Sequence, residues 1–480
     1  MEHVFDLPLR LPGKGSRRLL RSLHTQLRAA ILDGRLKAGL RLPPTRVMAA
    51  RYGIARNTAI AVYDLLLGEG HVVSRHGAGT YVADVRDRAK VRATAGNSER
   101  AEWMNSFWRY ASPTVNYWVH PPKFDFGAGI PDVGAFPLAI WRKLYARTLR
   151  SLLERARYGD PHGQVALRTS IASHVSFARA VACSADDVLV TSGAQQAFDL
   201  LARVLITRGR TRVAVEDPGH LPIRAAFAAA GAQIVPIPVD GEGMRVDQLP
   251  ATARIICVSP SHQFPSGCTM SMARRAALIE FAARHEAVVI EDDYDGEFRF
   301  SELATDALQT LDRTESVFYI GTFSKSLFPG LRLGFVIAPA WAMKALAAAR
   351  QSTDWHSDID KQEVLAAFIA EGHMARHMRR MRARYGERRE LLLRCLRENF
   401  ADRLSIVLSA AGLHICAHTR SGKETETIVD RARQNGMRIE SLRRFQLDTR
   451  SRPGMIFGYG AIEVAQIPKA LVLLDRLWRA

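Results

Sequence analysis

The sequence has no apolar run close to the roughly 20 residues that a helix needs to cross a bilayer. Its first residues, Met-Glu-His-Val-Phe-Asp, lack the pattern of a signal peptide. No Cys-x-x-Cys pair occurs among its five cysteines, which are Cys183, Cys257, Cys268, Cys395 and Cys416. An odd number without that spacing argues for reduced thiols and against structural zinc. These absences predict a cytoplasmic protein with no membrane partner and no metal site.

Acidic residues are also scarce, since 48 Asp and Glu stand against 67 Lys and Arg, for a net charge of +19. The imbalance is greatest in residues 1–100, which hold 18 Lys and Arg against 8 Asp and Glu, a net charge of +10. Charge on that scale favours a polyanionic partner such as DNA. At 480 residues, 47% of them hydrophobic, the chain is long enough for a large core plus a small additional domain.

The basic N-terminal part has the pattern of a helix-turn-helix. Apolar residues recur at helical spacing in residues 17–35, and this first helix ends at Gly34. Thr45 is placed to cap a short helix over residues 45–52, and after a glycine turn residues 55–67 predict a third helix.

Residues 71–75 and 80–83 flank a His-Gly-Ala-Gly turn and predict a β-hairpin, which would serve as a wing. An arginine opens each of the last two helices and reaches phosphates or base edges if the third helix enters the major groove. Taken singly, such arginines are more often solvated surface residues. The candidate DNA contacts are Thr45, Arg46, Arg56, Asn57, Thr58 and Gly79.

Lys325 ends the apolar stretch Tyr-Ile-Gly-Thr-Phe-Ser-Lys, and Arg332 follows seven residues later. A lysine can form an imine with an aldehyde and an arginine can hold a phosphate, so the pair suggests pyridoxal 5′-phosphate (PLP). The alternative is a surface lysine after a buried strand, which is the commoner meaning of an isolated Ser-Lys.

Residues 287–295, Ala-Val-Val-Ile-Glu-Asp-Asp-Tyr-Asp, favour the cofactor. This β-branched run predicts a buried parallel strand with acids at its carboxyl end, where ligands of open α/β sheets lie. Asp292 can hold the pyridine nitrogen protonated, and Tyr294 can hydrogen-bond the ring oxygen. Acids that merely solvate a strand end are the alternative for Asp293, Asp295 and Glu297.

In residues 187–201 an apolar strand passes through Thr-Ser-Gly into a helical pattern. Three backbone amides at the start of that helix would face an anion: those of Gly193, Ala194 and Gln195. Many α/β units have such a turn without a ligand. A further turn-rich segment, residues 259–267, predicts only a loop after a strand.

Taken together, these segments resemble the fold-type-I PLP enzymes of the aminotransferase class I and II group. The resemblance implies an α/β fold with a large PLP-transferase domain and a small C-terminal α+β subdomain. It also implies that Lys325 forms the internal aldimine with PLP, and that Asp292 and Tyr294 contact the pyridine nitrogen and the ring oxygen. Thr322 and Arg332 would bind the phosphate.

The N-terminal part resembles the GntR winged-helix domain. Two segments carry this resemblance: Gly-Arg-Leu-Lys-Ala-Gly-Leu-Arg-Leu-Pro-Pro-Thr-Arg and Gly-Ala-Gly-Thr-Tyr-Val. Joined to an aminotransferase-like domain, this is the layout of the MocR/GabR/PdxR transcriptional regulators, and residues 291–300 and 372–385 fit that subfamily. The resemblance implies a head-to-tail homodimer, a double-stranded DNA operator, and PLP or a small amine as effector.

The predicted domain order follows from these two resemblances. It is an N-terminal winged helix-turn-helix over residues 16–84, a linker over 85–122, and an aminotransferase-like domain over 123–480 whose small subdomain covers roughly 375–480.

Several positions depart from the aminotransferase pattern. Ile456 aligns with the arginine that usually binds the substrate carboxylate, and Arg450 or Arg452 just upstream are the candidates to replace it. His220 stands where relatives often have a tyrosine, and it either stacks on the cofactor ring or faces solvent. Tyr158 resembles the tyrosine that reaches the partner subunit's phosphate, the alternative being a tyrosine packed before a turn.

Two functional hypotheses therefore stand. The favoured one is a PLP-dependent regulator that senses PLP or an amine, because a basic winged helix has no role in transamination and fold does not establish activity. The alternative is a working aminotransferase with a fused DNA-binding domain; a third, an inert PLP domain, conflicts with the presence of Asp292, Lys325 and Arg332. The basic run 376–389 predicts the solvated face of a long helix, or else a second DNA contact.

Overall fold

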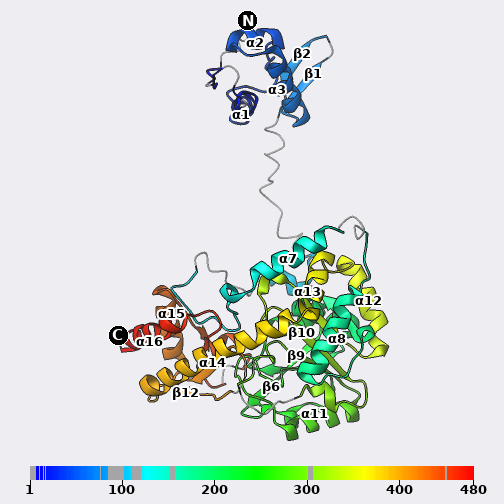
Figure 1. Cartoon of the computed structure of the whole chain (residues 1–480), viewed down its shortest axis with the longest axis vertical. Helices are drawn as coiled ribbons and strands as arrows, with labels where there is room; N and C mark the ends of the chain where they lie inside the picture. The colour runs from blue at the N-terminus through cyan, green and yellow to red at the C-terminus, as the bar shows by residue number, and fades with distance from the viewer. Residues whose placement is uncertain are drawn as a thin grey trace. The chain divides into compact units, whose positions relative to one another are not determined.

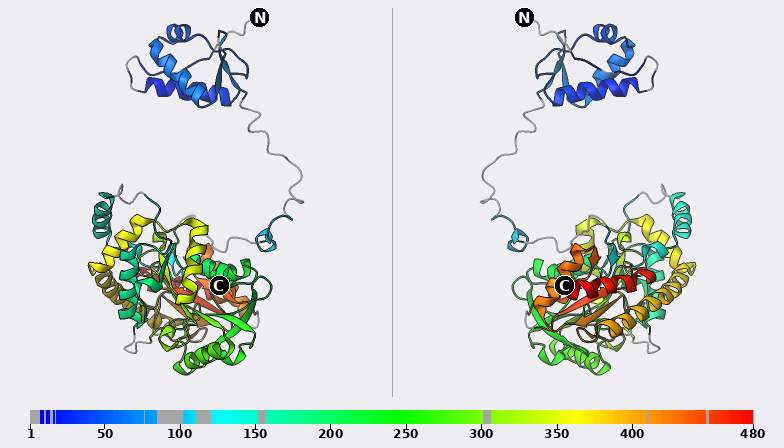
Figure 2. Two further views of the ribbon diagram at one scale, coloured as in Figure 1. Left: turned by 90° about the vertical axis from the view of Figure 1, so that its right-hand side faces the viewer. Right: turned by 90° about the vertical axis from the view of Figure 1, so that its left-hand side faces the viewer.

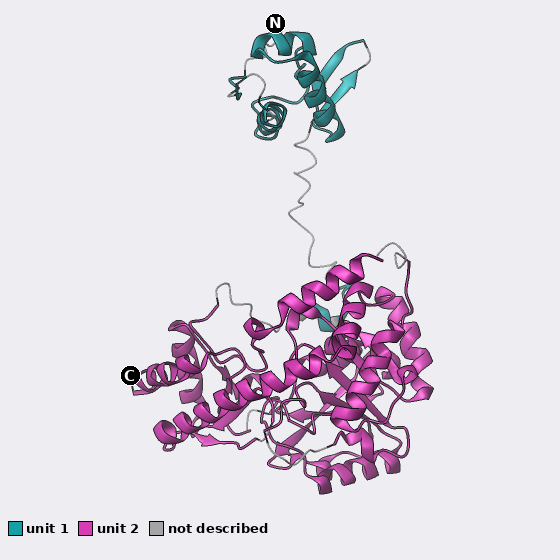
Figure 3. Ribbon diagram, in the orientation of Figure 1, with its two compact units in different colours: residues 1–109 teal, residues 110–480 magenta. Residues whose placement is uncertain are grey.

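The structure is a computed structural model that describes residues 7–9, 11–13, 16, 18–75, 77–84, 102–110, 121–151, 157–300, 306–409, 411–448 and 451–479. The chain divides into two compact units, Met1–Arg109 and Tyr110–Ala480 (Figure 3). Most of the expected linker, residues 85–122, lies outside the described residues. No described helix is both long enough and apolar enough to span a bilayer.

The described part of the N-terminal unit forms helices and one hairpin (Figure 1): α1 (Leu19–Leu32), α2 (Thr45–Tyr52), α3 (Arg56–Gly68), β1 (Val72–Arg75) and β2 (Gly79–Val82). Leu23 and Leu27 lie one turn apart on α1 and are fully buried against Met48 of α2 and Val62 of α3. β1 and β2 pair antiparallel. The predicted helix-turn-helix and wing are confirmed.

One detail of that prediction is wrong, because Thr45 does not cap α2. It is the first residue of the helix, and the boundary position is held by Pro44, which makes no side-chain cap hydrogen bond. The chain enters the helix directly from the extended Pro-Pro pair, since proline fixes its own φ and disfavours a helical residue before it.

A mixed eight-stranded sheet forms the centre of the second unit, in the order β4-β11-β10-β9-β8-β5-β6-β7. The strands from β10 to β6 are parallel, whereas β11 lies antiparallel between β10 and β4 and β7 is antiparallel to β6. The strands are β4 (Val188–Thr191), β5 (Arg212–Asp217), β6 (Gln233–Asp240), β7 (Gly243–Met244), β8 (Ala253–Val258), β9 (Val288–Asp293), β10 (Val317–Thr322) and β11 (Gly334–Ile337). The parallel strand predicted within residues 287–295 is confirmed as β9.

Alternate side chains of these strands enter different cores, as the period of two requires. Ile290 of β9 packs in a cluster with three helices, whereas Val289 next to it packs with α11. The three helices on the Ile290 side are α9 (Ala194–Leu205), α10 (Leu221–Ala229) and α12 (Ala340–Asp354), and α11 is Met272–His285. A third cluster joins the sheet to α7 (Leu138–Leu149), α8 (Val165–Arg179) and α13 (Ile359–Ala370).

The small subdomain contains an antiparallel sheet in the order β12-β13-β16-β15. Its elements are α14 (His373–Phe400), β12 (Ser405–Ile406), β13 (His414–His418), α15 (Gly422–Gln434), β14 (Met437–Arg438), β15 (Glu440–Ser441), β16 (Gly454–Gly458) and α16 (Ile467–Arg479). Figure 2 shows α16, in red, lying beside the orange elements of this subdomain. The short β3 (Phe124–Asp125) pairs with β14, so the start of the unit is tied to its end.

Short elements complete the described secondary structure. They are α6 (Ser106–Tyr110) and the 3-10 turns η1 (Val133–Ala135), η3 (Ala185–Asp187), η4 (Val246–Gln248), η5 (Leu308–Leu311), η6 (Pro329–Leu331), η7 (Leu442–Phe445) and η8 (Val464–Gln466).

The basic run 376–389 lies on α14, the long helix that Figure 1 labels between the large and small subdomains. Arg376 and Arg382 are exposed, as predicted for a solvated face, but Arg388 is buried. Its guanidinium contacts the Asp132 carboxylate at 2.8 Å and donates to the Gly460 carbonyl at 2.5 Å. The prediction is wrong for Arg388, because a paired and hydrogen-bonded arginine is stable in a core.

Candidate cofactor site and DNA-binding surface

One edge of the large sheet collects almost all of the predicted cofactor residues. Because β11 is antiparallel to both β10 and β4, strand β4 points in the same direction as β5, β8, β9 and β10. The carboxyl ends of these five strands therefore meet at one edge, which is where ligands of open α/β sheets bind. The residues placed there are Gly193 after β4, His220 after β5, Asp292 and Tyr294 at the end of β9, and Thr322 and Lys325 at the end of β10.

Lys325 lies in the turn after β10 and is half-buried. Burial lowers the pKa of its amine, and the nearby Asp295 and Asp292 carboxylates oppose that shift. Gly129 covers the amine so closely that a Cβ at that position would lie 2.9 Å from Lys325 Nζ. An amine with a lowered pKa is a better nucleophile near neutral pH, which is what imine formation with an aldehyde requires.

Arg332 lies against the start of α9. Its Nη2 donates to the Ser192 carbonyl at 2.8 Å, and a Cβ on Gly193 would come within 2.9 Å of the guanidinium. The first amides of α9, those of Ala194 and Gln195, have no acceptor in the preceding turn, as in any helix. The structure thus brings an arginine and a helix N-terminus together, which is a suitable combination for an anion.

Thr322 is the last residue of β10, and Gly334 of β11 lies directly opposite it. Its hydroxyl donates to Ser324 Oγ at 3.1 Å and accepts from the Ser324 amide at 3.2 Å. A Cβ on Gly334 would lie 3.0 Å from Gly193 Cα, so glycine at this position lets β11 pass close to the turn before α9.

Asp292 is buried on β9, beside Ile320 of β10. Burial, together with the neighbouring acids Asp293 and Asp295, raises the pKa of its carboxyl to about 8, although Lys325 opposes the shift. A cation next to this carboxyl would be strongly favoured, because it would remove the cost of a lone buried charge.

The other acids of this strand end do not solvate it, so the alternative reading of them is wrong. Asp293 accepts from Arg179 Nε at 2.5 Å and from the Tyr319 hydroxyl at 2.7 Å, and both it and Arg179 are buried. Asp295 is buried next to His262, and Glu297 contacts His174 at 2.6 Å. Asp293 and Asp295 are held by buried partners and Glu297 by the half-buried His174, which fixes the strand end in place.

Two predicted residues have surroundings that bear on their alternatives. His220 is half-buried with its ring edge-on to Phe264 at 5.4 Å, and burial lowers its pKa to about 3. It therefore faces the protein as a neutral ring. Tyr158 is 77% exposed, and its ring stacks on that of Trp355 of the same chain at 4.3 Å.

The position expected to bind a substrate carboxylate is apolar. Ile456 on β16 is fully buried in a cluster with Phe264 and Phe445, and Tyr294 packs against that cluster. Arg452 is exposed in the segment before β16, and Arg450 lies outside the described residues. The guanidinium of Arg444 lies over the ring of Phe445, a member of this cluster, with Cζ 5.9 Å from the ring centre.

Sequence reasoning missed three buried polar residues at this edge: Glu216, His262 and Asp295. Glu216 lies near the carboxyl end of β5. Its carboxylate accepts hydrogen bonds from the Ser259 amide and from Gln263 Nε2, each at 3.2 Å. Burial raises the pKa of this carboxyl to about 8. Residues 259–267 had predicted only a loop, and nothing in their spacing shows that β8 lies between β5 and β9.

The candidate DNA contacts gather at the starts of α2 and α3. Arg46, Arg56 and Asn57 are exposed, whereas Thr45 and Thr58 are half-buried. Gly79 opens β2 at a φ of 109°, and a Cβ there would lie 3.0 Å from Arg41 Nε. The side chains at the start of α3 are therefore free to meet DNA, as the prediction requires.

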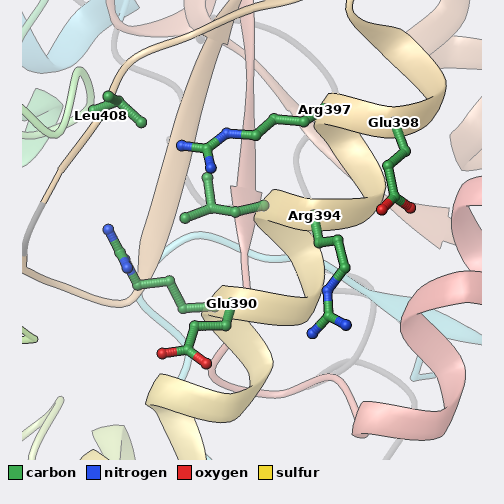
Figure 4. A pocket seen from close by; sticks show the side chains of 7 residues that line it. Glu390, Arg394, Arg397, Glu398 and Leu408 are labelled. Carbon is green, nitrogen blue, oxygen red and sulfur yellow. The ribbon is translucent and has the colours of Figure 1, made fainter.

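A separate hollow of about 430 Å³ borders α14 (Figure 4). Three arginines and two glutamates line it, so its charge is weakly positive; the lining residues are Arg389, Glu390, Leu393, Arg394, Arg397, Glu398 and Leu408. None of the predicted site residues lies there.

Comparison with known proteins agrees with both units. Residues 121–441 match the family model of aminotransferase class I and II, and residues 20–82 match that of bacterial regulatory proteins of the gntR family. The chain is 36% identical to the probable rhizopine catabolism regulatory protein MocR of Rhizobium meliloti, over 92% of this chain and 90% of that protein. It is 31% identical to the HTH-type transcriptional regulator TauR of Rhodobacter capsulatus, over 97% of each.

The chain belongs to the MocR/GabR/PdxR subfamily of GntR-type transcriptional regulators. The sequence-based identification of this subfamily is thereby confirmed. Among solved structures, an archaeal alanine:glyoxylate aminotransferase matches this MocR-type regulator with a TM-score of 0.70 and 26% identity, over 74% of this chain and 90% of that one. The second unit is therefore an aminotransferase-like domain of fold type I, as predicted.

Proposed function

We propose that the aminotransferase-like unit of this transcriptional regulator holds PLP on Lys325 and serves as the sensor of PLP or of a small amine. The observation that carries the proposal is the position of the Lys325 amine, whose pKa is lowered, between a buried acid and an anion cradle at one sheet edge. Each of these groups matches a different part of the cofactor: an aldehyde, a pyridine nitrogen and a phosphate.

The residues of the site fit that cofactor. Arg332, the first amides of α9 and the Thr322 hydroxyl would hold the phosphate, because they supply charge and donors around a space kept open by Gly193. Asp292 would keep a proton on the pyridine nitrogen, since its buried carboxylate needs a cationic partner. When bound, PLP supplies an electrophilic carbon and a ring that withdraws electrons.

The DNA-binding part of the function rests on the gntR-type domain. Its net positive charge and the exposed Arg46 and Arg56 support double-stranded DNA as the partner. Operator DNA also supports a cytoplasmic location. The exposed Tyr158–Trp355 stack supports the expected head-to-tail homodimer, in which Tyr158 reaches the partner's phosphate.

Turnover as an aminotransferase is the second candidate function, and the match to solved aminotransferases favours it. Against it stands the apolar cluster around Ile456, because a buried carboxylate needs a paired cation. We infer that an effector amine binds without efficient conversion to a keto acid, so that the domain reports the presence of the amine to the DNA-binding unit.

The deciding experiment uses full-length protein and DNA selected from a random pool. The protein is titrated with PLP and then with a panel of amines, while visible absorbance and DNA affinity are followed in the same sample. An amine that changes both together supports the sensor. A change in absorbance with constant DNA affinity for every amine would contradict it.

A further inference from the structure

A buried histidine contacts the tyrosine that is expected to meet the cofactor ring. His262 Nδ1 lies 2.9 Å from the Tyr294 hydroxyl and 3.0 and 3.1 Å from the two oxygens of Asp295. The side chains of His262 and Asp295 are each 1% exposed. The histidine and Asp295 were not among the residues predicted from the sequence.

Counting protons fixes the direction of these hydrogen bonds. A carboxylate can only accept, and Asp295 also accepts from the Leu413 amide at 3.2 Å. Nδ1 of His262 must therefore carry the proton and share it between Asp295 and the Tyr294 oxygen. A nitrogen that donates cannot also accept, so the Tyr294 proton points away from His262.

We propose that His262, held by Asp295, is a positioning residue that makes the Tyr294 phenol a directed donor toward the ring oxygen of the cofactor. The proposal rests on the proposed binding of PLP at this site. The N–H of His262 donates to the phenol oxygen, which polarises the Tyr294 O–H bond and strengthens its donation. Phe264 meets the Tyr294 ring edge-on at 6.0 Å and restricts its rotation.

The same residues connect the cofactor edge to the small subdomain. The backbone of Gly412, just before β13, passes so close to His262 that a side chain there would overlap the imidazole ring. His414 of β13 contacts the Pro265 carbonyl through Nε2 at 3.1 Å, and its ring lies 4.6 Å from that of His262. The backbone just before β13 therefore holds the imidazole of His262 in place.

A metal ion is the competing explanation for this cluster. His262, Asp295 and His414 are close enough to hold one, and His262 Nε2 and His414 Nδ1 have no hydrogen-bond partner among the described residues. Asp295 accepts hydrogen bonds from His262 and from the Leu413 amide, which favours the positioning role, because a metal would compete for the same lone pairs. Metal content is therefore measured as part of the test.

The test follows the pH midpoint of the visible absorbance of full-length protein loaded with PLP. That midpoint reports the proton on the nitrogen joining Lys325 to the cofactor. A donor to the ring oxygen stabilises negative charge there and lowers this midpoint, so weakening the donor raises it. Tyr294→Phe removes the donor and so gives the largest upward shift of the midpoint. We expect His262→Leu to raise the midpoint by about 0.5–1 pH unit, a three- to tenfold change in proton affinity.

Two further variants separate positioning from packing. His262→Asn keeps an N–H close to the Nδ1 position and should restore the wild-type midpoint, whereas His414→Phe changes a neighbouring buried ring and should leave the midpoint unchanged. If His262→Leu does not fold, His262→Gln replaces it, since its amide extends past Nδ1 and should raise the midpoint as well.

The outcomes distinguish this inference from the proposed function. Borohydride labelling of Lys325 with an unchanged midpoint in the His262 variant would overturn the inference alone, as would equal shifts in the His262 and His414 variants. One metal ion per wild-type chain, lost in His414→Phe, would also overturn it. Wild-type protein that captures no PLP would instead contradict the proposed function.

Discussion

At the scale of single residues, the pKa of the Lys325 amine is subject to two opposing effects, burial and the neighbouring carboxylates, and it is lowered. The carboxylates of Asp292 and Asp295 favour the charged amine, but burial outweighs them. Borohydride should therefore fix PLP to Lys325, and Lys325→Ala should lose this label and stay folded, because shortening one half-buried amine leaves the core intact. Mass spectrometry of the labelled peptide provides the measurement.

Lys344→Ala is the matched control, since Lys344 is exposed on α12 in the same unit and should not affect labelling. Label of wild-type intensity in Lys325→Ala, with loss only in Lys344→Ala, would refute the assignment of Lys325.

Arg332 tests the anion cradle at the same scale. Arg332→Ala removes a charged donor next to the start of α9, at a cost of about 1.5–3 kcal/mol for a charge-assisted contact. PLP affinity should fall by about 10- to 100-fold, while the label on Lys325 still forms at saturating PLP. Equilibrium dialysis gives the affinity. An unchanged affinity would place the phosphate elsewhere.

At the scale of elements, the start of α3 presents Arg56 and Asn57 to solvent, with Arg46 at the start of α2. We expect Arg46→Ala and Arg56→Ala each to weaken specific DNA binding by about 1–3 kcal/mol if the arginine reads a base, or to lower the salt slope by about one if it binds a phosphate. Fluorescence anisotropy at several salt concentrations distinguishes the two cases.

Arg21→Ala serves as the charge-matched control, because Arg21 is exposed on α1 and is not part of the helix-turn-helix pair. The PLP spectrum should be the same in all three variants. Specific binding that survives deletion of residues 1–100 would show that another part of the chain reads DNA.

Elements were predictable where a local pattern decides them. The short helix over residues 45–52 and the strand within 287–295 follow from apolar spacing, turns and β-branched residues. Contacts between distant segments were not predictable: the bond of His262 to Tyr294 depends on which strands are neighbours, and the burial of Arg388 depends on Asp132, far away in the sequence. Local physics fixes an element, whereas tertiary contacts decide what surrounds each side chain.

At the scale of the whole molecule, the question is whether bound amine is converted or only sensed. The site edge holds the groups for covalent capture, but the position expected to hold the arginine for an α-carboxylate is occupied by the buried, apolar Ile456. A sensor also has to retain its ligand long enough to affect DNA binding, and rapid conversion to a keto acid would end the signal.

We therefore expect slow or absent transamination with ordinary amino-acid and keto-acid pairs. An effector amine should still change the visible spectrum of PLP-loaded protein, since exchange at Lys325 needs only the amine, the attached cofactor and the proton held through Asp292. Single-turnover mixing with each α-amino acid measures the conversion. Complete conversion of the cofactor to its amine form at about 1 s⁻¹ or faster, the rate of a working enzyme, would show instead that this regulator is also an active aminotransferase.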